Sequence, residues 1–168
     1  GPWMVRVSDY NPMESAAGLF GINLVMLTAF FVWGYFLPKI IKGKLTSLKL
    51  MKFGLPISYL VLLIIIILGS KAGAFLLTLY ILTSIFLTLA QPAVALSFPK
   101  YLAGKAFTSF NLLIFVGTFI MQWGIGLVID LAQNFGKNEI ASFQISFFVY
   151  FLICIICYLY FLFKNKNE

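Results

Sequence analysis

The sequence predicts an all-α integral membrane protein with five transmembrane helices, and three features predict it. Its 168 residues are 62% hydrophobic and only 10% charged, against about 25% charged in ordinary water-soluble domains. The mean hydropathy is +1.02, and several apolar runs approach or exceed the roughly 18 residues of a spanning helix. Alternation with a period of two is absent, so strands are not expected, because lipid-exposed backbone must satisfy its own hydrogen bonds.

Polar breaks divide the chain into five apolar segments. We expect the helices at about residues 15–37, 53–70, 73–97, 106–130 and 142–163. Even the shortest covers about 27 Å at 1.5 Å per residue, which is enough for a thin hydrocarbon core.

The first segment, 15–37, carries a polar residue in an otherwise apolar helix. Asn23 shares one helical face with Phe30 and Gly34, because residues seven and eleven positions apart nearly coincide around a helix. Small residues allow two membrane helices to approach closely, so Gly34 is expected at a packing or gating position.

Segments 53–70 and 142–163 are apolar on nearly every face, and the second is rich in bulky aromatic residues. We expect both on the outside of a bundle, in contact with lipid. Cys154 and Cys157 form a C-x-x-C pattern in the second, which in a soluble chain would suggest a redox or zinc site. Inside an apolar helix the pair is interpreted as inert packing.

Segment 73–97 carries a stripe of hydrogen-bonding side chains. They lie within about 80° of one another around a helix with 100° between residues. Pro92 is expected to kink this helix, because proline removes a backbone donor and crowds the preceding turn. The stripe consists of Tyr80, Ser84, Thr88 and Gln91.

Segment 106–130 has a narrower stripe, made of Asn111, Thr118 and Gln122. The three lie within about 40° around the helix. Gly124 and Gly126 follow, and we expect them where the helix approaches a neighbour or flexes during gating.

Two interpretations of these stripes remain open. An amide facing lipid costs several kcal/mol, so the stripes must point at each other or at water. They could knit the helices together by hydrogen bonds, which in membranes average about 0.6 kcal/mol each. Three stripes on three helices instead favour an aqueous pathway, in which hydrogen bonding acts without charge.

The basic residues predict the orientation of the chain. If the five segments alternate, nine of the 12 basic residues fall on one side, whereas four of the five acids fall on the other. The positive-inside rule makes the lysine-rich side cytoplasmic, so the N-terminus lies outside and the C-terminus inside. The nine are Lys39, Lys42, Lys44, Lys49, Lys52, Lys100, Lys105, Lys164 and Lys166.

Several function classes are excluded by what the sequence lacks. The net charge of +7 comes from short connecting segments, not from a basic face with interleaved aromatic residues, so no nucleic-acid partner is expected. The chain has no histidine, which rules out His-based catalysis and His-ligated zinc. We expect no enzyme, no metal and no cofactor.

The order of features resembles the C-terminal half of a major facilitator superfamily transporter, in a bacterial permease-like branch. The start, "GPWMVRVSDYNPMESAAGLF", is similar to the end of the family's seventh helix and the beginning of its eighth. "WGYFLPKIIKGKL" falls where the family has a basic cytoplasmic loop, and there Lys42 and Lys44 supply the positive charge. "FPKYLAGKAFTSFNLLIFVGTFIMQWGIGLVIDL" is the most specific part, with Lys100 and Lys105 in its loop, and "ASFQISFFVYFLI" resembles the beginning of the twelfth helix.

This resemblance implies that the five segments are helices eight to twelve, most of one six-helix half. It also implies that the eighth, tenth and eleventh helices line a central cavity, while the ninth and twelfth lie at the periphery. The expected function is then secondary transport of a small solute by alternating access. The missing N-terminal half, the lipid bilayer and an unidentified small molecule would be its partners, in a bacterial inner membrane. The alternative is a non-transporting membrane subunit or scaffold.

Overall fold

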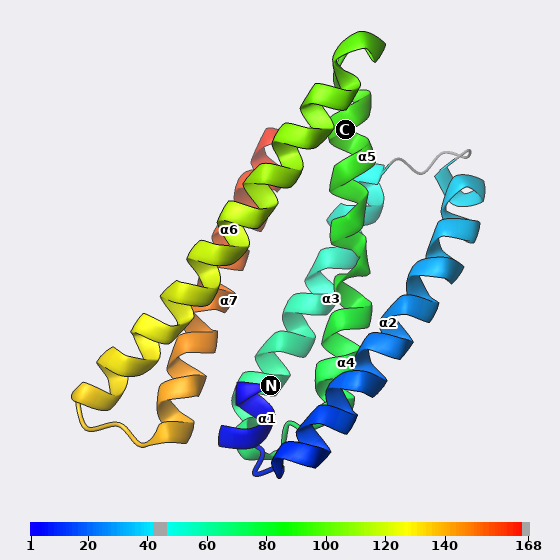
Figure 1. Ribbon diagram of the computed structural model, residues 1–168. Helices are drawn as coiled ribbons and strands as arrows, with labels where there is room; N and C mark the ends of the chain where they lie inside the picture. Colours follow the sequence, from blue (N-terminus) through cyan, green and yellow to red (C-terminus); the bar gives the residue numbers. More distant parts are fainter. Residues whose placement is uncertain (42–46, 166–168) are drawn as a thin grey trace.

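The computed structural model describes residues 1–41 and 47–165, and these form helices and turns without any strand (Figure 1). The α-helices are α1 (Pro2–Arg6), α2 (Pro12–Ile41), α3 (Ser47–Leu68), α4 (Ala74–Thr83), α5 (Ala90–Leu96), α6 (Lys100–Asn134) and α7 (Glu139–Lys164). Two 3₁₀ stretches, η1 (Gly69–Lys71) and η2 (Ser84–Leu89), lie between them.

Five helical spans of the described chain are long and apolar enough to cross a membrane. The prediction of an all-α chain with five helices long and apolar enough to span a membrane is therefore confirmed. Two helices begin six residues earlier than expected: α3 begins at Ser47, not at about 53, and α6, which has 35 residues, begins at Lys100, not at about 106. Helix α6 is the longest of the described helices. At 1.5 Å per residue it is about 52 Å long and must tilt or project beyond a hydrocarbon core of about 30 Å. The spans are Pro12–Lys39, Ser47–Lys71, Ala74–Leu96, Lys100–Asn134 and Glu139–Lys164.

Asparagine side chains cap the N-terminal ends of two of the spans. Asn11 accepts a hydrogen bond from the backbone of Glu14 at 2.8 Å, and Glu14 accepts one from the backbone of Asn11 at 2.9 Å. This reciprocal pair satisfies two backbone donors at the start of α2. Asn138 accepts a bond from the backbone of Ala141 at 2.8 Å and so caps α7.

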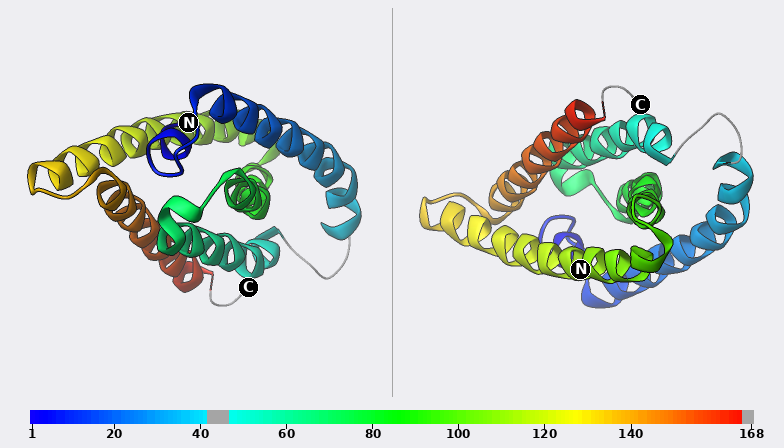
Figure 2. Two further views of the ribbon diagram at one scale, coloured as in Figure 1. Left: turned by 90° about the horizontal axis from the view of Figure 1, so that it is seen from below. Right: turned by 90° about the horizontal axis from the view of Figure 1, so that it is seen from above.

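The central span is made of α4, η2 and α5, and the other helices surround it (Figure 2). The α4 part packs against α2 and α3, whereas the α5 part packs against α6. Helix α7 lies between α6 and α3 and packs against both.

Helix α3 is buried along one face, and this corrects the expectation for 53–70. Eight of its residues are buried, whereas α6 has one buried residue, Ala132. The opposite face of α3 exposes Phe53, Leu60 and Ile67 and remains available to lipid. The predicted contact with lipid therefore applies to only one face of this helix. A helix that is apolar all round does not reveal which of its faces meets protein.

The glycines that allow close packing are not those predicted. A Cβ placed at Gly34, Gly124 or Gly126 would meet nothing within 4 Å, so these are not packing points within the described chain. At Gly54 of α3, by contrast, a Cβ would overlap the ring of Phe86 in η2.

The central span is irregular just before Pro92, where a kink was predicted. Residues Ser84–Leu89 form 3₁₀ turns, and Pro92 lies inside α5. Proline has no N–H for the carbonyl four residues earlier, here that of Thr88, and its ring crowds that carbonyl. The disturbance therefore falls on the turn before the proline.

The charges separate to the two ends of the bundle, as the alternation of five spans requires. Six of the eight lysines in the described residues gather where α2, α5 and α7 end, whereas Asp9, Glu14, Asp130 and Glu139 lie at the other end with Lys71 and Lys137. Lys42 and Lys44 of the predicted basic loop lie outside the described residues. At the acidic end an Arg6 Nη1 to Glu139 Oε1 ion pair of 3.2 Å joins α1 to α7.

Candidate functional site: a membrane cavity and interhelical polar contacts

The polar stripe of the central span faces α2. Tyr80, Ser84 and Thr88 border a cavity of about 200 Å³ whose other wall includes Met26 and Phe30 of α2. Ser84 donates to the backbone oxygen of Tyr80 at 2.7 Å, and Thr88 donates to that of Ile85 at 2.7 Å. Both hydroxyl protons are thus used within the span, which leaves the oxygens as acceptors.

Tyr80 also reaches another helix. Its hydroxyl lies 3.3 Å from the hydroxyl of Tyr150 on α7, within hydrogen-bond distance. Tyr150 was not among the predicted residues, because the aromatic residues of 142–163 were all expected to face lipid. A phenol among phenylalanines and aliphatic residues was the available signal, since a buried tyrosine hydroxyl usually finds a partner.

Two predicted residues on different helices meet directly. The Gln91 side-chain nitrogen of α5 donates to the Asn111 side-chain oxygen of α6 at 3.3 Å. The stripes of the third and fourth segments therefore point at each other at this level, as expected of amides that avoid lipid.

Two other predicted residues, Asn23 and Thr118, form their side-chain hydrogen bonds within their own helices. Asn23 donates to the backbone oxygen of Leu19 at 2.7 Å, and Thr118 donates to that of Ile114 at 2.8 Å. Both side chains are exposed in the described chain. The structure therefore does not bring the eight predicted cavity residues into one site, because each of these two satisfies itself on its own helix.

Gln122 borders a cavity that five helices line together. The cavity has a volume of about 530 Å³ and is bordered by α1, α2, α4, α6 and α7. Gln122 supplies the polar side chain, and no charged side chain is present among the described residues that line it. The lining residues are Gly1, Pro2, Trp3, Leu19, Ile22, Leu77, Ile81, Gln122, Ile125, Gly126, Ile129, Phe143 and Phe147.

Aromatic residues that sequence reasoning did not select form one wall of this cavity. The ring of Trp3 packs on Phe147, with centroids 4.6 Å apart, and edge-on against Phe143 at 6.4 Å. The Trp3 indole N–H donates to the backbone oxygen of Ala72 at 3.2 Å, and this fixes the ring. The apolar residues around it gave no periodic signal in so short a helix.

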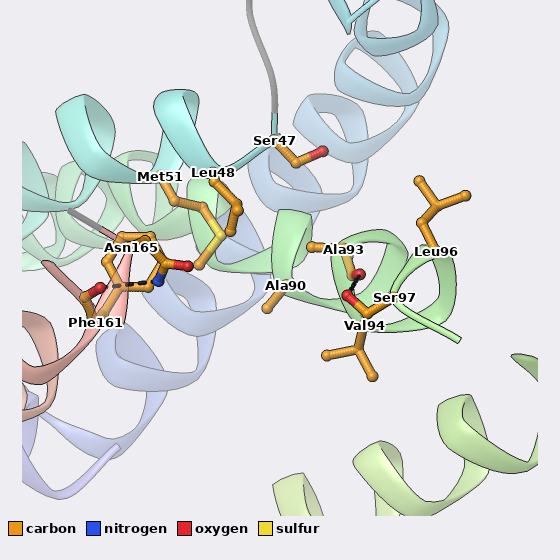
Figure 3. A pocket seen from close by; sticks show the side chains of 10 residues that line it. All are labelled: Ser47, Leu48, Met51, Ala90, Ala93, Val94, Leu96, Ser97, Phe161 and Asn165. Atoms are coloured by element: carbon orange, nitrogen blue, oxygen red, sulfur yellow. Dashed lines mark hydrogen bonds between the residues drawn. The ribbon is translucent and has the colours of Figure 1, made fainter. Parts of the chain in front are cut away.

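A second large hollow lies at the lysine-rich end, between the beginning of α3, the α5 helix and the end of α7 (Figure 3). Its volume is about 570 Å³. Ser47, Ser97 and Asn165 are its polar residues, and Leu48, Met51, Val94 and Phe161 are among its apolar ones. Ser97 and Asn165 donate to backbone oxygens of their own helices, at 2.8 Å and 2.9 Å.

No protein-family model, curated protein or solved structure matches this chain. Within residues 1–41 and 47–165 no group of three or more His, Cys, Asp or Glu could hold a metal ion. Cys154 and Cys157 are free thiols on α7. What the cavities offer is hydrogen bonding and apolar contact.

Proposed function

We propose that this chain is the C-terminal membrane part of a secondary transporter of the major facilitator type, with the five spans as its eighth to twelfth helices. One observation carries the proposal. Helices α2, α4 and α6 all border the cavity of about 530 Å³, whereas α3 borders none of it, and Gln122 is the member of the polar stripes that lines it. The resemblance implies this placement for the eighth, ninth, tenth and eleventh helices. Helix α7, the twelfth, departs from it, because Phe143 and Phe147 also line the cavity.

The cavity suits a small solute without strong charge. Its walls are apolar and aromatic, and the amide of Gln122 offers both a donor and an acceptor. Ligand sites are commonly apolar pockets of about 300–1,000 Å³ in which a few polar groups fix the orientation. In the proposed mechanism a second bundle closes the pathway, and the two bundles rock about the bound solute.

The proposal places the lysine-rich end in the cytoplasm and the acidic end outside, in a bacterial inner membrane. Its basis is the separation of lysines and acids to opposite ends of the bundle, because basic residues accumulate on the cytoplasmic side of membrane proteins. The bilayer and a second, N-terminal helical half are the partners that the proposed mechanism requires.

A non-transporting membrane subunit is the rival function, and a specific observation favours it. The Gln91 and Asn111 pair and the Tyr80 and Tyr150 pair use their polar groups to join helices. If such pairing were the whole purpose of the stripes, the amides would hold an assembly together and no solute would pass.

Uptake by the full-length natural protein in proteoliposomes tests the proposal. For any solute that is taken up, Gln122→Ala should lower uptake by roughly two- to tenfold, the worth of one hydrogen bond of about 0.5–1.5 kcal/mol. Gln133→Ala is the matched control, because Gln133 lies exposed near the end of the same helix and does not border the cavity.

The two functions predict different results. Uptake that falls with Gln122→Ala and persists with Gln133→Ala supports transport through this cavity. Absence of flux across a broad panel of sugars, amino acids and amphipathic compounds, from protein that is folded and inserted, favours the scaffold.

A further inference from the structure

The lysine-rich end of the bundle has hollows that adjoin one another. The hollow of about 570 Å³ shares Val94 with a neighbouring hollow of about 380 Å³, which lies between α5 and α6. It also shares Leu48, Phe161 and Asn165 with a narrow third hollow bordered by Lys52. Neither the Gln122 cavity nor the proposed transport makes use of this region.

The hollow between α5 and α6 combines an apolar groove with a cation. Lys105 and Ser109 border it, and the remaining lining residues are apolar. On α6 the lining follows one helical face through Leu102, Ala106, Phe110 and Leu113, at intervals of three or four residues. A molecule in this groove would therefore meet a charged side chain near one end and hydrocarbon along its length.

The length of the groove matches one leaflet of a bilayer. From Leu102 to Leu113 the helix rises about 16 Å, at 1.5 Å per residue. Half of a hydrocarbon core of about 30 Å is about 15 Å. An acyl chain could therefore lie along the groove from the interface to about the middle of the membrane.

The charged side chains near the lysine-rich end of the groove are all positive. Lys100 and Lys105 on α6 and Lys164 on α7 are exposed at this end. All four acids in the described part of the chain lie at the opposite end. A cluster of lysines beside membrane helices attracts anionic lipid, at about 1 kcal/mol for each basic residue near the surface, which corresponds to a roughly fivefold change in affinity.

We propose that the groove between α5 and α6 binds an anionic phospholipid of the surrounding bilayer. One acyl chain lies along Leu102, Phe110 and Leu113, and the phosphate lies by Lys100 and Lys105. The exposed hydroxyl of Ser97, at the end of α5, lies three residues before Lys100. This binding does not depend on transport, so its test stands apart from the uptake assay.

Native mass spectrometry of the full-length natural protein tests the proposal. The protein is purified in a neutral detergent and titrated with phosphatidylglycerol or with phosphatidylcholine. We expect phosphatidylglycerol to bind more tightly. The double substitution Lys100→Gln and Lys105→Gln should weaken its binding by about tenfold or more and leave phosphatidylcholine binding nearly unchanged.

Two further variants separate the effect of charge near the groove from the effect of the groove itself. Lys71→Gln with Lys137→Gln removes the same charge from the opposite end and should leave phosphatidylglycerol binding unaltered. Ala106→Trp fills the groove and retains both lysines, and it should weaken the binding of the acyl chain.

Three results would overturn the proposal. Equal affinity for the two lipids would show that charge is not recognised. Equal loss in the two lysine double variants would show a general charge effect. Displacement of phosphatidylglycerol by inorganic phosphate alone would identify a site for a soluble anion instead of a lipid.

Discussion

Gly54 shows how one residue can decide the packing of two spans. Without a side chain at this position, α3 packs directly against the ring of Phe86 in η2. Phe86 in turn packs edge-on against Trp33 of α2, with ring centroids 5.4 Å apart. One glycine thus allows a contact that links three spans.

We expect Gly54→Ala to lower the free energy of unfolding by about 1–3 kcal/mol, the usual cost of overpacking a close contact. The new methyl group would overlap the near atoms of the Phe86 ring, so the backbone must shift. The thermal unfolding midpoint of the protein in detergent measures this effect.

Gly34→Ala and Gly124→Ala are the controls for this substitution. Both glycines lie inside helices and face open space, so alanine should raise helix stability by up to about 1 kcal/mol. A fall in the midpoint for either control equal to that of Gly54→Ala would contradict the packing argument.

At the scale of the element, the central span differs from the others because 3₁₀ turns interrupt it in the middle. Pro56 lies inside α3, which remains α-helical from Ser47 to Leu68. Pro92 follows six residues in 3₁₀ turns, Ser84–Leu89. The two helices show that a proline permits an irregular turn but does not by itself require one.

Pro92→Ala should make residues 84–89 more regular. Alanine restores the backbone donor for the carbonyl of Thr88 and removes the crowding of the ring. Hydrogen–deuterium exchange of the segment, followed by mass spectrometry, should therefore slow in the variant.

The same exchange measurement on Pro56→Ala supplies the comparison. Because α3 is already regular, residues 52–56 should change much less. Unchanged exchange at 84–89 in Pro92→Ala would mean that packing of η2 against α3, and not the proline, sets the 3₁₀ geometry.

The elements were largely predictable, because spanning helices follow from length and hydropathy alone. The sites were less predictable, since periodicity gives the face of a helix but not its partner. Gln91 and Asn111 were found because both their stripes turn toward each other. Asn23 and Thr118 satisfy themselves on their own helices, and short polar side chains can do so on any face.

Close approach was the least predictable property. Gly54 differs from Gly34, Gly124 and Gly126 only in what lies opposite, which no local pattern contains. Tyr150 was missed for the same reason, because its role depends on Tyr80 seventy positions earlier in the chain.

For the whole molecule, orientation in the membrane is the property that can be tested most directly. The proposal makes the lysine-rich end cytoplasmic, so Ser97 should lie inside the cell and Gln133 outside. Both residues are exposed at opposite ends of the bundle.

Single cysteines at these positions provide the measurement. They are introduced as Ser97→Cys or Gln133→Cys, in a background that carries Cys154→Ala and Cys157→Ala. A membrane-impermeant thiol reagent should label the Gln133→Cys protein in intact cells and the Ser97→Cys protein only after permeabilisation. The reverse pattern would contradict the orientation.

Two of the turns at the acidic end, the first around Ala72 and the second around Gly136, differ in how tightly they are bound to the rest of the protein. The carbonyl of Ala72 accepts bonds from both Trp3 and Ser8, at 3.2 Å and 2.8 Å. The turn around Gly136 is exposed, and Phe135 is 83% accessible. An inserted epitope or crystallisation partner would therefore disrupt the first turn, whereas the second offers room for one.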